Sequence, residues 1–175
     1  ELSRTIGDKS IQTYSYNELG WTYYDEGDFA RAQENFSISA NLAQEIENKW
    51  TRSESLNGLG FIACDLNKLA NARQLLSQAL SISVSADAIT EVLLVVVGHA
   101  KLFERQGNLS YACELLGLCL SHPACDSEIK HFAQKTLNLF RQNHPEIQLD
   151  PFLQNGSNLD YQIVVAALLA GEMNA

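Results

Sequence analysis

The sequence has few basic residues and no long apolar stretch. It contains 12 Lys and Arg against 21 Asp and Glu, which gives a formal net charge of −9 over 175 residues. Because nucleic-acid binding needs clustered positive charge, direct binding to nucleic acid is excluded as a function class. The longest fully apolar runs, residues 92–97 and 163–170, are much shorter than the roughly 20 residues that span a bilayer. We therefore expect a soluble protein without membrane contact, whose partners are cationic or neutral.

Cysteine and methionine are also scarce. The four cysteines, at positions 64, 113, 119 and 125, include no Cys-x-x-Cys pair and lie within helical patterns. Such cysteines act as small apolar side chains and stay reduced, which is typical of a reducing compartment. We therefore expect a cytoplasmic protein. The chain opens at Glu1 without a signal segment, and its one methionine is Met173. We interpret it as a part excised from a longer protein.

The sequence contains an internal repeat with a constant step. Residues 6–20 align with residues 46–60 through these pairs: Ile6 with Ile46, Lys9 with Lys49, Asn17 with Asn57, Leu19 with Leu59, and Gly20 with Gly60. A more diverged third copy keeps the step, because Ala100, Gly107 and Ala112 continue the positions of Gly20, Gly27 and Ala32. A repeat of this length predicts stacked supersecondary units.

Each copy has the pattern of two antiparallel helices joined by a tight turn. In the first copy, apolar residues recur at helical spacing on both sides of residues 26–28. Gly27 is suited to the positive φ of a helix C-terminus, and Asp28 to capping the next helix. The corresponding turns are predicted at residues 67–68 and 107–108. The small residues shared by the copies predict close helix contacts at 20/60/100 and 32/72/112.

These positions resemble the tetratricopeptide repeat. The first copy carries its signature as Leu19-Gly20-x-x-Tyr23-x-x-x-Gly27-x-Phe29-x-x-Ala32-x-x-x-Phe36. The 40-residue step exceeds the usual step of about 34 residues, and is similar to the repeats of bacterial STAND-type, MalT-like regulators. The resemblance implies an all-α, right-handed superhelix of antiparallel helix pairs with C-terminal capping helices. Its expected parts are the tail of a preceding repeat (1–9) and three repeats (10–48, 49–85 and a diverged 86–122).

The remaining residues are expected to close the array. A capping helix is predicted within residues 123–145, with Asp126 or Ser127 as its cap, followed by a loop over 145–158. Residues 159–170 should form a last helix. Since residues 163–170 are all apolar, we expect this helix to be covered on more than one side. It either folds back on the array or contacts another subunit, and the candidate residues for a homo-oligomer contact are Ile163, Val164, Ala167 and Leu168.

The resemblance also implies a concave groove lined by the first helix of each pair. Its expected residues are Tyr14, Asn17, Glu18, Trp21, Tyr24, Asp25, Glu54, Asn57, Phe61, Cys64, Asp65, Leu94, Val97, Lys101, Glu104 and Arg105. The paired Asn residues would hydrogen-bond an extended peptide, the aromatics would supply flat contact area, and the carboxylates would favour Arg or Lys on the ligand. The same mixture suits a sugar. Alternatively, Trp21 and Phe61 pack between repeats. Chaperone-binding tetratricopeptide domains hold a C-terminal carboxylate with basic residues, the carboxylate clamp. These basic residues are absent here, since Asn17 and Asn57 stand in their place, so a C-terminal chaperone tail is a poor candidate ligand.

Candidates for chemistry are weak. Cys119-x-x-His122-x-x-Cys125, followed by His131 and preceded by Cys113, does not follow a standard zinc spacing, so helix packing is the preferred interpretation. His99 lies in an apolar stretch and is interpreted as a core residue. No nucleophile or phosphate-loop motif is present. We expect no cofactor, no metal and no enzymatic activity.

The sequence thus favours a scaffold or sensor module of a larger bacterial signalling or transcription regulator, which binds a peptide or partner domain through the groove. Two alternatives stay open at this point. One is a sensor of a sugar-like small molecule, and the other is an oligomerisation segment that acts through residues 163–170.

Overall fold

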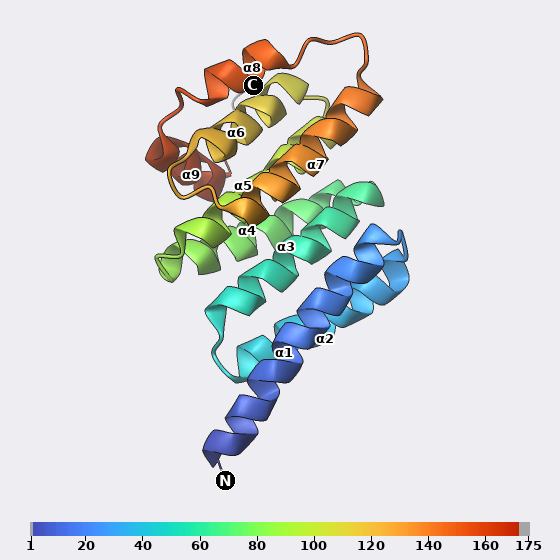
Figure 1. Ribbon diagram of the computed structural model, residues 1–175, viewed down its shortest axis with the longest axis vertical. Coiled ribbons are helices and arrows are strands. Elements are labelled where there is room, and N and C mark those ends of the chain that lie inside the picture. Colours follow the sequence, from blue (N-terminus) through green and yellow to red (C-terminus); the bar gives the residue numbers. More distant parts are fainter. Residues whose placement is uncertain (1, 172–175) are drawn as a thin grey trace.

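The computed structural model describes residues 2–171, together with their side chains from residue 8 onward. This part of the chain is entirely helical and without strands (Figure 1), which confirms the all-α prediction. Its helices are α1 (Leu2–Asp25), α2 (Phe29–Glu45), α3 (Lys49–Asp65), α4 (Leu69–Ser85), α5 (Ile89–Arg105), α6 (Leu109–Ser121), α7 (Ser127–Asn143), α8 (Asp150–Gly156) and α9 (Tyr161–Ala170). None of these helices combines the length and the apolar character needed to cross a membrane.

The turns between α1 and α6 recur at a regular interval, which is half the step of the sequence repeat. Each turn places one residue in the left-handed region, and these are Gly27, Glu47, Asn67, Asp87 and Gly107. The next residue is the N-cap of the following helix. The side chains of Asp28, Asn48 and Asn108 each accept a hydrogen bond from the backbone N–H three residues later. The turns predicted at 27–28, 67–68 and 107–108 are therefore confirmed.

The shared small residues lie at close contacts between the two helices of a pair. A Cβ atom added to Gly20 would come within 2.6 Å of the Phe36 ring, and one added to Gly60 within 2.7 Å of Leu76. Ala32, Ala72 and Ala112 are completely buried. The repeated Gly and Ala positions thus allow the two helices of each pair to pack closely, as the sequence predicted.

Helices α1 to α7 pack in chain order, and alternate helices also contact one another. Contacts join α1 to α3, α3 to α5 and α5 to α7, so these four helices form one layer. Helices α2, α4 and α6 make up a second layer, in which each helix packs against the two odd-numbered helices that flank it in the chain. The groove residues predicted from the sequence all belong to the first three helices of the odd-numbered layer. Because α7 continues this layer, it is well placed to contact them.

Helix α7 follows the sequence prediction closely. Asp126 is its N-cap, and the carboxylate accepts hydrogen bonds of 2.9 Å from the backbone N–H groups of Glu128 and Ile129. The helix ends at Asn143, before His144 and Pro145. Ile129, Ala133, Leu137 and Phe140 are buried. The apolar face of α7 is therefore part of the core rather than a loosely attached cap.

The prediction of a loop over residues 145–158 is wrong, because α8 forms at residues 150–156. Asp150-Pro151 reads as a turn in the sequence, but proline is equally suited to the first turn of a helix, where its missing N–H has no partner to lose. Helix α8 packs against α6 with little space between them. A Cβ atom at Gly117 of α6 would come within 2.2 Å of the carbonyl oxygen of Leu153 in α8.

The expectation that the last helix is covered on more than one side is also wrong. Helix α9 packs against α4 and buries Val164, Val165 and Leu168 on one face, while Ile163 on the opposite face is 69% exposed. It therefore folds back on the array. Val164 and Leu168 are occupied within the chain, which contradicts their predicted role in an oligomer contact. Of the other two candidates, Ala167 is half-buried, so Ile163 is the one that is fully accessible.

Candidate functional site

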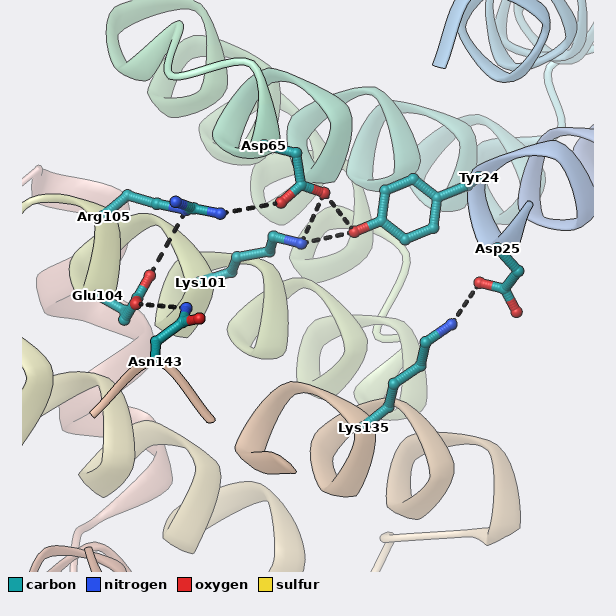
Figure 2. Close-up of polar contacts among 8 residues, drawn as sticks. All are labelled: Tyr24, Asp25, Asp65, Lys101, Glu104, Arg105, Lys135 and Asn143. Carbon is teal, nitrogen blue, oxygen red and sulfur yellow. Dashed lines mark hydrogen bonds and ion pairs between the residues drawn. The ribbon is translucent and has the colours of Figure 1, made fainter. Parts of the chain in front are cut away.

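Five of the predicted groove residues form a network at the ends of α1, α3 and α5. The Tyr24 hydroxyl donates to Asp65 Oδ2 at 2.7 Å, and Lys101 Nζ lies 2.8 Å from the same oxygen (Figure 2). Arg105 approaches the other Asp65 oxygen at 3.3 Å and also pairs with Glu104. Burial lowers the pKa of Lys101, although Asp65 opposes this shift, and burial next to Asp65 raises the pKa of Tyr24. These groups satisfy one another, so they are not free to bind a partner.

Helix α7 lies beside this network, and polar contacts from α7 and from His144 just after it reach Asp25, next to Tyr24, and Glu104 within the network. Figure 2 shows Lys135 of α7 pointing toward Asp25 of α1, with which it forms an ion pair. At the end of α7, Asn143 donates to Glu104 Oε1 at 3.2 Å, and His144 Nε2 lies 3.0 Å from the same oxygen. Asp25 and Glu104 were both predicted to face a ligand. In the structure, this chain's own α7 takes the place of that ligand.

The aromatic residues predicted for the groove form a packed cluster around Trp21. Its ring centroid lies 5.0 Å from that of Phe36, 5.6 Å from that of Phe61 and 4.6 Å from that of Phe132 on α7. Phe61 is only 3% exposed, and Trp21 is half-buried. Both rings therefore pack between helices, which is the alternative that the sequence left open, and Phe61 has no area left for a partner.

The paired asparagines are also interior residues. Asn17 and Asn57 are buried, and both serve contacts between neighbouring repeats. Asn17 Oδ1 accepts a hydrogen bond of 2.9 Å from Ser55, while Asn57 Nδ2 donates to the carbonyl oxygen of Leu94 at 3.2 Å. Their predicted role as donors to a bound peptide is contradicted. The other predicted groove residues that the structure buries are Cys64, Leu94, Val97, Lys101 and Glu104.

One part of the predicted groove remains open to solvent. It is a pocket of about 370 Å³ lined by Tyr14, Glu18, Asn48, Trp50, Thr51, Glu54 and Glu128, which we call the acidic pocket. Helix α1 supplies Tyr14 and Glu18, and the start of α7 supplies Glu128. The remaining residues come from α3 and its N-cap. Tyr14 is 58% exposed and Trp50 is 59% exposed, so both rings are accessible.

The electrostatics of the acidic pocket are dominated by its three carboxyl groups, since its described lining contains no Lys or Arg. Burial raises the pKa of Glu54 to about 7, and the negative charges of Glu128 and Glu18 add to this shift. The side-chain donors of Asn17 and Trp21 act in the opposite direction and lower the pKa of Glu54. Burial also raises the pKa of Glu128, together with the nearby charge of Asp126. The pocket therefore concentrates negative charge that nothing in its lining compensates.

Sequence reasoning found Tyr14, Glu18 and Glu54 but missed the other residues of the acidic pocket. Trp50 carried a usable signal, because it is one of only two tryptophans and occupies the first turn of a predicted helix. Glu128 carried none. The whole of α2 to α6 separates it from Glu18 along the chain, and only the folding of α7 onto the odd-numbered layer brings the two together.

The cysteine and histidine residues considered for chemistry do not form a common site. Cys113 and Cys119 are buried in α6, and burial raises the pKa of the Cys113 thiol to about 11. His122 Nδ1 instead accepts a hydrogen bond of 3.1 Å from the backbone of Ala124. His99 is a core residue, as predicted, and burial lowers its pKa to about 4. Within residues 8–171, no group of three or more His, Cys, Asp or Glu side chains is placed to hold a metal ion.

No family model, curated protein or solved structure matches this chain. The function is therefore inferred from the chemistry of the acidic pocket and of the helices around it.

Proposed function

We propose that the chain is a non-catalytic interaction module that binds a basic segment of a partner protein in the acidic pocket. The supporting observation is that the described lining of this pocket combines three carboxyl groups, no basic residue and two exposed aromatic rings. The rest of the predicted groove is closed by α7 or buried. A basic side chain would gain charge-assisted hydrogen bonds from the carboxylates and a cation–π contact from Tyr14 or Trp50.

We further propose that the helix pairs form a superhelix like that of tetratricopeptide repeats, and that the module belongs to a larger bacterial regulator. The internal sequence repeat, the left-handed turn residues and the small residues at the helix crossings support the first part. The second part rests on the resemblance to long-step repeats of such regulators. In this setting the chain serves as a scaffold or a sensor, and binding requires no cofactor.

The proposal is tested with short, fluorescently labelled Gly-Ser peptides that carry several basic, acidic or no charged residues. Fluorescence anisotropy should detect binding of the basic peptides alone, and the affinity should fall as salt is raised. The double variant Glu18→Gln/Glu128→Gln should weaken this binding by about tenfold or more, because two charge-assisted contacts are lost. Glu34→Gln/Glu114→Gln is the matched control, since it removes the same charge outside the pocket.

Two results would contradict the proposal. One is equal binding of basic and neutral peptides, and the other is an equal effect of the pocket variant and its control. Circular dichroism must show that both variants keep the helicity of the wild type. With this condition met, a loss of binding reports on the pocket rather than on the fold.

A sugar-like ligand is the second candidate, and one observation favours it. An exposed tryptophan beside carboxylates can stack on a sugar ring and accept hydrogen bonds from its hydroxyl groups. A thermal-shift screen of sugars would reveal such a ligand as a rise in melting temperature that grows with ligand concentration. The rise should disappear in Trp50→Ala.

A further inference from the structure

We propose that the acidic pocket recognises the guanidinium group of an arginine in preference to a lysine ammonium group, and that Glu54 releases a proton to solvent when the arginine binds. This inference rests on the proposed function, because it specifies the basic group that the pocket takes. It is carried by the shape and chemistry of the pocket walls and by a buried donor beneath Glu54 that lacks a well-formed hydrogen bond.

The walls of the acidic pocket offer both kinds of contact that a guanidinium group makes. Its carboxyl groups come from three helices, with Glu18 on α1, Glu54 on α3 and Glu128 on α7. A guanidinium carries a planar fork of N–H donors, which can bond several carboxylates at once. Its flat faces stack on aromatic rings such as Tyr14 and Trp50, both of which are more than half exposed. An ammonium group is compact and strongly hydrated, and it uses fewer of these contacts.

Glu54 is held from below by groups that favour its charged form. Trp21 Nε1 donates to Glu54 Oε1 at 3.2 Å. The Asn17 amide also acts on Glu54 and lowers the pKa of this carboxyl group. Asn17 is completely buried, and although its amide faces Glu54, its Nδ2 makes no hydrogen bond of good geometry in the free protein. In the second repeat the same Nδ2, that of Asn57, donates to the carbonyl oxygen of Leu94 at 3.2 Å.

A buried donor without a well-formed hydrogen bond is costly, and Glu54 is the acceptor that the Asn17 amide faces. The Asn17 and Trp21 donors therefore prepare the pocket floor for a carboxylate. What the free protein lacks is a positive charge on the solvent side of Glu54. An arginine in the pocket would supply it and would hold Glu54 in the ionised form that the Asn17 and Trp21 donors favour.

The charged groups that face Glu54 from the other helices oppose its ionisation in the free protein. They are Glu18 on α1 and Glu128 on α7, while the Tyr14 phenol of α1 is neutral, and none of these residues is basic. Together with burial, the two carboxylates hold the pKa of Glu54 at about 7, so it is partly protonated near neutral pH. A bound cation favours the ionised form, and linkage then requires that binding releases a proton.

The test compares three Gly-Ser peptides that differ only in carrying arginine, lysine or citrulline at the same positions. Citrulline keeps the shape of arginine but has no charge. Isothermal titration calorimetry near pH 7, in phosphate and in Tris, gives both the affinity and the number of protons released. We expect arginine to bind about tenfold more tightly than lysine and citrulline to show no binding. The arginine titration should show heats that depend on the buffer, and so should the weaker lysine titration, because either cation favours an ionised Glu54.

Variants assign these effects to single groups. Glu54→Gln should abolish proton release while the protein stays folded, and Trp50→Ala should bring the arginine affinity down to that of lysine. Glu34→Gln, which lies outside the pocket, should leave affinity and proton release unchanged.

The possible outcomes separate this inference from the proposed function. Equal affinity for arginine and lysine would overturn the preference for guanidinium and leave a basic partner in place. Arginine binding without proton release, or with release that persists in Glu54→Gln, would overturn the role of Glu54. If none of the charged peptides binds, the proposed function fails along with this inference.

Discussion

Lys101 of α5 and Asp65 of α3 form an ion pair of 2.8 Å that is almost sealed from solvent, with 5% of the lysine side chain and 16% of the aspartate side chain exposed. The two residues differ in the partners that remain when the other one is removed. Asp65 keeps Arg105 and Tyr24 as partners if Lys101 is removed, whereas Lys101 is left without a carboxylate if Asp65 is removed. The two residues should therefore respond differently to substitution.

We predict that Asp65→Leu lowers the free energy of unfolding by about 3 to 5 kcal/mol, because it leaves a buried ammonium group uncompensated. Lys101→Met should cost clearly less, and the double variant should recover part of the loss caused by Asp65→Leu. Urea denaturation followed by circular dichroism measures all three. Asp25→Asn is a suitable control, since it breaks the more exposed pair with Lys135 and should cost about 1 kcal/mol or less. Equal losses for all of these variants would contradict the prediction.

A second prediction concerns pH. The pKa of Glu54 is about 7 in the folded chain and about 4.3 in an unfolded one. As the pH rises from about 4 to 7, the unfolded state therefore loses this proton first, and folding becomes less favourable. Above this range the contribution is constant.

The variant Glu54→Gln removes that dependence. Between about pH 5 and pH 8, the wild type should lose on the order of 2 kcal/mol more unfolding free energy than the variant does. Denaturant titrations at several pH values measure the difference. Glu34→Gln should behave like the wild type, and a Glu54→Gln curve parallel to the wild type would refute the assignment.

The third prediction tests the close helix contacts. In Gly20→Ala the new Cβ would lie 2.6 Å from the Phe36 ring, so the ring or one of the two helices must move. Overpacking of this kind costs about 1 to 3 kcal/mol, which exceeds the gain in helix propensity of about 1 kcal/mol. The melting temperature should fall. Adding Phe36→Leu should reduce the penalty of Gly20→Ala, because the smaller side chain leaves room for the methyl group.

The fourth prediction concerns the contact between α1 and α7. The centroids of Trp21 and Phe132 lie 4.6 Å apart, and Phe132 is the residue of α7 that reaches the aromatic cluster. In a Trp50→Phe background, Trp21 is the one remaining tryptophan. Phe132→Ala should then move its fluorescence emission to longer wavelength as water reaches the ring. An unchanged spectrum would show that α7 does not cover Trp21 in solution. Leu139→Ala, an exposed change on the same helix, is the control.

Much of the architecture could be predicted from the sequence, because the signals were local. Gly27 and Asp28 adjoin in the chain and determine one turn together, and Gly107 and Asn108 do the same. At 67–68, Asn67 takes the left-handed conformation, but the Lys68 side chain does not cap the next helix. The small residues at 20 and 60 report the packing of helices that are neighbours in the chain. Helix α8 was missed because proline at residue 151 suits a turn and a helix start equally well.

The candidate site was harder to predict, because it depends on distant residues. Asn17 and Asn57 recur in equivalent places, and this recurrence reflects a shared role inside the array rather than a shared ligand. The sequence also gave no sign that α7 would approach Asp25 and Glu104, which lie far from its contact residues Lys135 and Asn143 along the chain. Once α7 occupies that region, the acidic pocket is the part of the predicted groove that stays open to a ligand.

The even spacing of the left-handed turn residues, from Gly27 to Gly107, has a consequence for how such a chain can change in evolution. A gain or loss of one whole helix pair that begins and ends at equivalent turns returns the backbone to the same conformation and keeps the order of the two layers. Such a change alters the distance between α1 and α7 without requiring a new kind of helix contact. Because the acidic pocket needs Glu18 and Glu128 together, a chain with one helix pair more or fewer would lose this pocket.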